Sequence, residues 1–407
     1  MTERLEPFGL LADMPITKKK TKKVSSKKQT SLLIQADSGD PDMLHFSRFH
    51  SSDPFLVFSH GKKKIGLAVP MEFSRMKKES ALDEVLLLSE VNDGASKRFK
   101  LPKEKSPDEC QIVRHLAKEY GIDEFRISDR FPAGLALQLR EAGVKLSVAE
   151  RGGLLPEREI KTADEIKALK KGNRAAAAGH RAVAKILQEA KIRKDGKLTH
   201  NGKILTSERL REVIGQATFA EGAIAYDTIA ASGDQACDCH DAGHGPIRAG
   251  ELIVVDIFPQ RIADGYWGDM TRTFLKGKAS DAQRKLVRTV KRGHELGMQA
   301  TRPGATGGDV QEVVDQFFAK EGYKTVKKSE TPEGFFHAIG HGIGIQVHEK
   351  PVVRRHSKAV LKPGMVITIE PGLYYRGLGG VRIEDVVHVT ADGYEKISSA
   401  PYKWEIA

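Results

Sequence analysis

The chain has 407 residues, of which 40% are hydrophobic, and its 66 basic and 54 acidic residues give a net charge of +12. This composition excludes a wholly disordered chain, a collagen-like repeat and a small disulfide scaffold, and the length predicts two or three domains. The sequence also excludes a membrane-spanning helix, since no uncharged apolar run approaches the roughly 18 residues that such a helix needs.

The first forty residues are polar and rich in serine and lysine, so we predict a basic tail over residues 1–40. Acidic residues and proline stand near its start, where a signal peptide needs an apolar segment. Residues 18–28 hold seven lysines, and such a run of like charges favours a solvated, extended segment. Contact with a nucleic acid or an anionic surface is the alternative. Few aromatic side chains lie nearby to stack on bases, so we do not expect nucleic-acid binding.

Residues 41–157 alternate between strand and helix signals, which is typical of an α/β domain. The predicted strands are short apolar or alternating runs bounded by glycine, proline or charge: Pro54–Phe58, Lys64–Val69 and Glu84–Leu88. The predicted helices run from Ser106 to Ala117 and from Pro132 to Ala142, where Gly143 is a typical helix stop.

Residues 158–407 form the predicted second domain. It begins with a helix over Ile160–Glu189, in which Thr162-Ala-Asp-Glu resembles a capping box. Two strands follow, Leu252–Phe258 and Gly268–Phe274, and the intervening Asp264-Gly265 predicts an antiparallel hairpin. The remaining patterns predict two helices and three strands: Ser280–Gln299, Gly308–Glu321, Ile343–Val347, Met365–Glu370 and Val381–Thr390.

Four carboxylates lie in or beside the predicted core strands of this second domain: Asp256, Asp269, Glu370 and Glu384. Burying a carboxylate is unfavourable unless a partner compensates its charge. Each acid could have its own partner, such as an arginine, but four repeats of one pattern favour a shared positive charge. Bound divalent metal supplies such a charge.

Three histidines, His337, His341 and His348, lie within twelve residues near the end of the chain. The spacing of the first two would suit one face of a helix. Glycines at 340, 342 and 344 instead favour a tight loop that lets the backbone approach a crowded centre. We therefore expect these histidines to join the carboxylates.

These residues lie in motifs that resemble those of the pita-bread metallopeptidases, which include methionine aminopeptidase, aminopeptidase P and prolidase. The motifs, in the order of the family, are Val254-Val-Asp256, Gly268-Asp269-Met-Thr-Arg-Thr, Gly340-His341-Gly-Ile-Gly-Ile-Gln-Val-His348-Glu, Thr368-Ile-Glu370-Pro-Gly and Val381-Arg-Ile-Glu384-Asp. The resemblance extends from Ile160 to the end of the chain. With fewer motifs, Asp53-Pro-Phe and Ser128-Asp-Arg-Phe-Pro resemble the N-terminal domain of the creatinase and prolidase branch.

The resemblance implies an α+β protein, with a creatinase-like α/β N-terminal domain before a pita-bread catalytic domain that has a curved antiparallel sheet. It also implies five ligands for two divalent metal ions: Asp256, Asp269, His341, Glu370 and Glu384. Within the family pattern, Asp269 and Glu384 would bridge the two ions. Oxygen-rich ligands with one imidazole suit manganese, cobalt or iron, with zinc as a further candidate, and we favour manganese.

The implied chemistry is hydrolysis of a peptide bond by a hydroxide that bridges the two metals. Glu370 would carry the proton to the leaving nitrogen. His240 and His348 would hydrogen-bond the substrate or the tetrahedral intermediate. His337 and Arg382 would shape the substrate pocket.

The chain departs from the family pattern before the first ligand. The family usually has a histidine there, and His240 matches only with a shift of one residue, while Cys239 occupies the unshifted place. Asp256 is followed by Ile-Phe-Pro rather than by a small residue and glycine. Cys237, Cys239, His240 and His244 could also suggest a zinc site by composition, but their spacing lacks a second cysteine pair.

We therefore predict a metallo-exopeptidase for peptides with proline at the second position, of either the aminopeptidase P or the prolidase type. Methionine aminopeptidase activity is one alternative, because His348-Glu-Lys-Pro also resembles that branch. A non-catalytic binding module is the other, and the basic tail is the feature that favours it. A homodimer is an expectation from the family. The three cysteines suit a reducing compartment, so we expect a cytoplasmic protein without a membrane partner.

Overall fold

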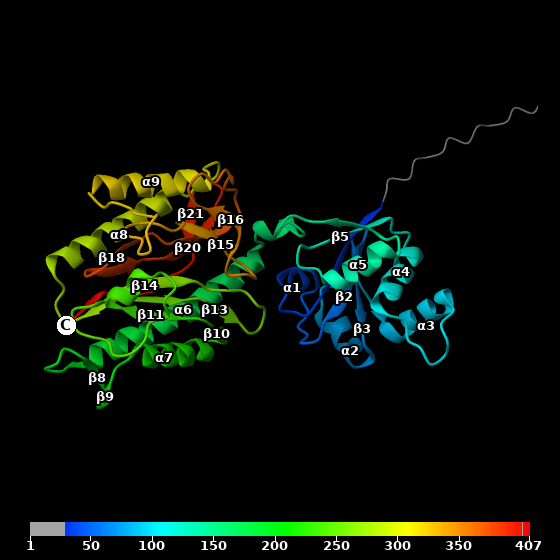
Figure 1. The fold of residues 1–407 in the computed structure, drawn as a ribbon, viewed down its shortest axis with the longest axis horizontal. Helices are drawn as coiled ribbons and strands as arrows, with labels where there is room; N and C mark the ends of the chain where they lie inside the picture. Colours follow the sequence, from blue (N-terminus) through cyan, green and yellow to red (C-terminus); the bar gives the residue numbers. More distant parts are fainter. Residues whose placement is uncertain (1–28, 401) are drawn as a thin grey trace, which may run out of the picture.

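The computed structural model describes residues 29–400 and 402–407, so the lysine-rich run at residues 18–28 lies outside the described part. Two units lie side by side (Figure 1), an N-terminal unit in blue to cyan and a larger one in green to red. A 3₁₀ helix over Pro156–Glu159 precedes the long helix that opens the larger unit. The domain boundary predicted at residue 157 falls inside this 3₁₀ helix.

The N-terminal unit is built on a six-stranded sheet with the order β4-β3-β2-β1-β5-β6. Its strands are β1 (Thr30–Ala36), β2 (Phe55–His60), β3 (Lys63–Ala68), β4 (Glu84–Leu87), β5 (Glu124–Ile127) and β6 (Lys145–Val148). Strands β1, β2 and β3 pair antiparallel, while β4, β5 and β6 each join in parallel. The three strands predicted between residues 54 and 88 are thereby confirmed.

Strand β1 corrects the predicted tail over residues 1–40, because it lies at the centre of this sheet, between β2 and β5. The strand was missed because its sequence signal is only a short apolar run, Leu32-Leu-Ile, in an otherwise polar stretch next to many lysines. Its side chains at Leu33 and Ile34 are buried, although the sequence before them is strongly charged. The ordered domain thus begins earlier than predicted.

Five helices pack on this sheet: α1 (Pro41–Ser47), α2 (Pro70–Glu79), α3 (Leu88–Phe99), α4 (Glu109–Glu119) and α5 (Ala133–Glu141). Helix α4 begins with a capping box in which Asp108 and Gln111 bond each other's backbone N–H groups. Helices α4 and α5 match the two predicted helices, and Gly143 follows α5 with a φ of 82°, which glycine adopts without strain. Helices α1, α2 and α3 were not predicted from the sequence.

The larger unit opens with α6 (Ala163–Glu189), and α7 (Ser207–Ala220) packs beside it. The predicted capping box is confirmed, since Thr162 and Glu165 exchange side-chain and backbone hydrogen bonds. Both helices cover a four-stranded sheet with the order β11-β12-β14-β22. Its strands are β11 (Ile229–Ser232), β12 (Leu252–Ile257), β14 (Met270–Lys276) and β22 (Glu405–Ile406), and β12 pairs antiparallel with β14, as predicted.

A second sheet of five strands has the order β16-β15-β17-β20-β21 and pairs antiparallel throughout. It contains β15 (Gly340–Gly342), β16 (Glu349–Val353), β17 (Val366–Ile369), β20 (Asp385–Val389) and β21 (Tyr394–Lys396). Smaller sheets are formed by β7 (Lys191–Ile192), β8 (Leu198–His200) and β9 (Lys203–Ile204), by β10 (Ala223–Ala225) and β13 (Pro259–Arg261), and by β18 (Gly372–Tyr375) and β19 (Gly379–Arg382).

Helices α8 (Asp281–Ala300) and α9 (Gly307–Lys320) cover the second sheet and match the two helices predicted there. The strands therefore lie between two helix pairs, with α8 and α9 on one side and α6 and α7 on the other (Figure 1). The predicted α+β class is confirmed. Within the described residues, the search for a helix long and apolar enough to cross a membrane finds none.

Two predicted strands near the end of the chain differ from the structure. Residues 343–347 form a loop between β15 and β16, because Trp267 bonds the carbonyls of Gly344 and Ile345. The predicted strand Val381–Thr390 is split into β19 and β20. At the break the N–H of Glu384 donates to Thr271 O in β14, so the chain crosses between the sheets there.

Candidate active site

The four strand-associated carboxylates converge because of the strand registers. In the antiparallel pair β12–β14, Asp256 lies opposite Thr271, and Asp269 stands one residue before β14. In the pair β17–β20, Ile369 lies opposite Asp385. Glu370 follows the first of these strands and Glu384 precedes the second, so both acids occupy the same end of the pair. Each acid thus lies within one residue of the first or last residue of a buried strand.

All the predicted site residues line one cavity of about 1160 Å³. The set consists of five predicted ligands and four predicted substrate contacts: Asp256, Asp269, His341, Glu370, Glu384, His240, His337, His348 and Arg382. The N-terminal unit adds residues that sequence reasoning missed, including Arg130 and Arg151. Arg130 lies within the motif Ser128-Asp-Arg-Phe-Pro, which could have indicated it, whereas no local signal marked Arg151.

The cavity floor brings ligand-type atoms close together. His341 Nε2 lies 3.4 Å from Glu370 Oε1 and 3.7 Å from Asp269 Oδ2. One donor atom each from Asp269, His341 and Glu384 lies within 4.8 Å of the others. Among the described residues no such group includes Cys237 or Cys239, so the alternative zinc site has no support there.

These acids are crowded and poorly solvated. Burial raises the pKa of Asp269 well above its ordinary value, and the neighbouring Asp256 and Glu370 carboxylates raise it further. Burial and Asp269 likewise raise the pKa of Glu384. Burial raises the pKa of Glu370 to about 8, although Arg382 opposes this shift. The site therefore favours added positive charge, supplied either by protons or by metal ions.

Arg382 is the cation next to this group. Its side chain is only 4% exposed, and Nη2 donates to Asp256 Oδ2 at 2.9 Å. Nη1 donates to Tyr374 Oη at 3.0 Å. The other carboxylate oxygen of Asp256, Oδ1, is buried without a hydrogen-bond partner in the described part of the chain. One guanidinium cannot neutralise four carboxylates, so the donor set and this orphaned oxygen fit divalent cations.

Two buried threonines orient the acids, and sequence reasoning missed both. Thr271 Oγ1 donates to Glu384 Oε2 at 2.8 Å. Thr368 Oγ1 donates to Glu370 Oε1 at 3.5 Å and accepts from the His341 N–H at 3.2 Å. Such partners fix the direction of a ligand's oxygens. Each lies two residues from an acid within its motif, which is the signal that could have identified it.

The histidines surround the acids. Burial lowers the pKa of His341 to about 3, and His348, whose ring centre lies 4.3 Å away at 84°, adds to this shift. Burial lowers the pKa of His337 to about 3 as well, and its Nε2 lies 3.0 Å from Tyr374 Oη. A neutral imidazole has a free lone pair for a metal ion or a substrate donor. His240 lines the cavity beside Cys239.

The position of Asp269 depends on a close backbone contact. A Cβ on the preceding Gly268 would lie 2.2 Å from the carbonyl carbon of Gly172 in α6. Backbone atoms cannot move aside as a flexible side chain can, so we expect Gly268→Ala to destabilise the fold by about 1–3 kcal/mol. Gly215→Ala in α7 is the matched control, because a Cβ there meets nothing within 4 Å and should stabilise the helix by about 0.5–1 kcal/mol.

Urea unfolding of both glycine variants measures these changes. The metal content of Gly268→Ala should fall together with its stability, since Asp269 moves with the strand. A Gly268→Ala protein as stable as the unmodified chain would contradict the close contact.

Comparisons with known proteins agree with this fold and site. The chain is 34% identical over 202 residues to an Xaa-Pro dipeptidase from Pyrococcus furiosus, a match that covers 48% of this chain and 55% of the relative. It is 29% identical over 311 residues to an Xaa-Pro dipeptidase from Pyrococcus horikoshii, covering 74% and 81%. The solved structure of an Xaa-Pro dipeptidase from Bacillus anthracis superposes with a TM-score of 0.76 at 24% identity, covering 93% and 95%.

A family model assigns the larger unit. Residues 167–391, more than half of the chain, match the model of metallopeptidase family M24. This range contains all five predicted ligands and, apart from the first turn of α6, the two helix pairs that flank the sheets. The chain therefore belongs to metallopeptidase family M24 and has its pita-bread fold.

Proposed function

We propose that the protein is a metal-dependent exopeptidase that hydrolyses Xaa-Pro peptide bonds. The observation that carries this proposal is the convergence of Asp256, Asp269, His341, Glu370 and Glu384 on the floor of one cavity. Membership of a metallopeptidase family supports the reaction type, and the names of the similar dipeptidases support the substrate class.

The five residues on the cavity floor would hold two divalent metal ions, with manganese as the favoured metal. Bound ions would lower the pKa of a coordinated water and polarise the scissile carbonyl. The protein contributes the fixed directions of the ligand oxygens, through Thr271 for Glu384 and Thr368 for Glu370. Arg382 supports the set by holding Asp256 at one of its two oxygens.

Glu370 is the residue that we propose to move the proton. Its Oε1 lies 3.4 Å from His341 Nε2, and its side chain is 19% exposed, compared with 14% for Asp256 and 5% for Asp269. It can take a proton from the attacking water and return it to the proline nitrogen as the bond breaks. His240 and His348 line the same cavity and would hydrogen-bond the substrate carbonyl.

His337 and Arg382 have buried contacts that favour a supporting role. His337 lies against Tyr374 Oη at 3.0 Å, and the same oxygen accepts from Arg382 Nη1 at 3.0 Å. We therefore propose that both shape the pocket through Tyr374. The predicted role of His337 and Arg382 in substrate binding would then be indirect and exerted through Tyr374.

The size of the cavity bears on the length of the peptide. Its volume of about 1160 Å³ is similar to the upper end of the roughly 300–1,000 Å³ of sites for drug-sized ligands, so a tripeptide is small enough to fit. We expect cleavage of Ala-Pro-Ala as well as Ala-Pro.

The three free cysteines support a cytoplasmic location for this activity.

The test is product analysis of manganese-loaded protein given Ala-Pro, Ala-Pro-Ala and Met-Ala-Ala in parallel. Release of alanine from the first two supports the proposal. Cleavage of Ala-Pro alone would restrict the enzyme to dipeptides, and methionine release from the third peptide would move it to the methionine aminopeptidase branch. A metal-loaded protein that cleaves none of them would refute the Xaa-Pro assignment.

A further inference from the structure

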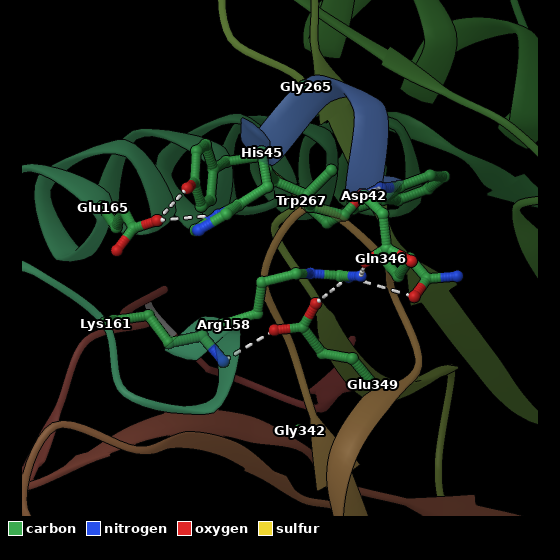
Figure 2. Close-up of polar contacts among 12 residues, drawn as sticks. Asp42, His45, Arg158, Lys161, Glu165, Gly265, Trp267, Gly342, Gln346 and Glu349 are labelled. Carbon is green, nitrogen blue, oxygen red and sulfur yellow. Dashed lines mark hydrogen bonds and ion pairs between the residues drawn. The ribbon is translucent and has the colours of Figure 1, made fainter. Parts of the chain in front are cut away.

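Side chains outside the sheets of the larger unit hold the loop that carries His348. Glu349, the next residue, accepts from Arg158 Nη2 at 2.8 Å through Oε2 and from Lys161 Nζ at 2.6 Å through Oε1. Figure 2 shows the Glu349 carboxylate between these two cations. Arg158 and Lys161 lie at the junction of the two units, in and just after the 3₁₀ helix that precedes α6.

Arg158 extends this contact to the N-terminal unit. Its Nη1 donates to Asp42 Oδ1 in α1 at 2.7 Å, and its Nη2 also donates to Gln346 Oε1 in the loop at 3.0 Å. The side chains of Arg158 and Asp42 are only 8% and 3% exposed. A single buried guanidinium thus joins α1 to residues on both sides of His348 (Figure 2).

Helix α1 is a firm anchor for this network. Its Leu44 is buried in a cluster with Leu169 of α6 and with Tyr266 from the turn after β13. The packing is close, since a Cβ on Gly265 would lie 2.5 Å from Leu44 Cδ2. Asp42 is therefore fixed relative to the catalytic unit by apolar packing.

The loop itself is shaped around the Glu349 carboxylate. A Cβ on Gly344 would lie 2.3 Å from Glu349 Oε1, so the loop backbone wraps directly over this group. On its other side Trp267 Nε1 donates to Ile345 O at 2.9 Å. Moving Glu349 would therefore move the loop and, with it, His348.

The energetics favour positioning over stability as the purpose of the network. Arg158, Lys161, Asp42 and Glu349 form two buried cations and two buried anions, so their formal charges cancel. Buried ion pairs add little net stability over apolar packing of the same size, because desolvation offsets their attraction. Their directional hydrogen bonds nevertheless fix geometry.

We propose that this network, Asp42–Arg158–Glu349 with Lys161, is a positioning device through which the N-terminal unit sets the place of His348 in the cavity. Arg158 and Asp42 are positioning residues that act through the loop. The inference rests on the proposed function in one respect, namely that His348 contacts the substrate.

Asp42→Asn tests the network, because asparagine keeps the shape of the side chain and removes its charge. We expect kcat/KM for Ala-Pro-Ala to fall about tenfold in the otherwise unmodified protein, in the range of couplings between contacting residues. In a His348→Ala background the same substitution should change kcat/KM less than about twofold. Metal content should stay unchanged in both backgrounds.

Hydrogen–deuterium exchange supplies a readout independent of activity. Peptides that cover residues 343–349 should exchange faster in Asp42→Asn. Asp164→Asn is the matched control, since it makes the same substitution near the same junction, at an exposed aspartate whose ion pair with Lys167 at 2.9 Å lies within α6. It should leave exchange in the loop and kcat/KM unchanged.

The outcomes separate the inference from the proposed function. An equal loss from Asp42→Asn in both backgrounds, or unchanged exchange in the loop, would overturn the network and leave the Xaa-Pro assignment intact. A similar loss in Asp164→Asn would also overturn it, because any loss of an acidic charge near the junction would then suffice. Full activity of His348→Ala would instead refute the substrate contact of His348 and the network that acts through it.

Discussion

Replacing Glu370 by glutamine is expected to lower kcat by about a thousandfold or more, since a positioned acid–base group alone contributes about 10²–10⁴-fold. Glutamine keeps the size of the side chain and can still accept from Thr368, but it cannot carry a proton. It also removes one of the negative charges that we propose to hold metal. Turnover and metal loading should therefore fall together.

Steady-state kinetics on Ala-Pro-Ala and metal analysis of the purified protein measure both effects. Glu395→Gln is the matched control, because it makes the same substitution at a half-exposed glutamate that pairs with Lys170 away from the cavity. This variant should retain normal kcat and metal content. A Glu370→Gln enzyme with full activity would show that another group transfers the proton.

Removing the metal is expected to abolish turnover and to make stability depend on pH in a defined direction. Folding raises the pKa of Glu370 from 4.5 to about 8 in the metal-free site and raises that of Asp269 and Glu384 as well. Between pH 4.5 and about pH 8, the folded, metal-free protein therefore binds more protons than the unfolded chain. Its stability therefore falls as pH rises, by at most about 1.4 kcal/mol per pH unit for each group.

Bound metal ions reverse this trend, because they favour the ionised carboxylates. The difference in Tm between manganese-loaded and chelated protein should accordingly increase from about pH 5 to about pH 8. Buried histidines away from the ligands, such as His180 with its pKa lowered to about 3, act in both samples and cancel from the difference. Thermal unfolding at fixed manganese concentration, with and without chelator, measures it. A constant difference across this range would contradict the crowding of the carboxylates.

The predicted ligands could be found from the sequence because each acid ends or enters a short apolar run. An unpaired carboxylate at such a place is unfavourable, so the pattern itself indicates a charge partner. The capping box at Thr162 was readable for a similar reason, since it is a contact between residues three apart. These features depend on neighbours within a few residues along the chain.

Features that depend on distant partners were missed or misread. Strand β1 is central only because β2 and β5 flank it, and its own short apolar run gave too weak a signal beside the lysines. Residues 343–347 have the composition of a strand, but hydrogen bonds from Trp267 hold them as a loop. In both cases tertiary contacts outweighed the local preference.

The sequence by itself determined the family, the α+β class and the acids and histidines of the candidate site, because motif spacing and apolar patterning are local properties. Only the tertiary structure decided which residues of the N-terminal unit line the cavity and which buried contacts hold its loop in place. It brought Arg130 and Arg151 of the N-terminal unit to the cavity, and it placed Arg158 between Asp42 and Glu349. Such contacts join residues that are far apart along the chain, and their geometry exists only after both units have folded and packed together.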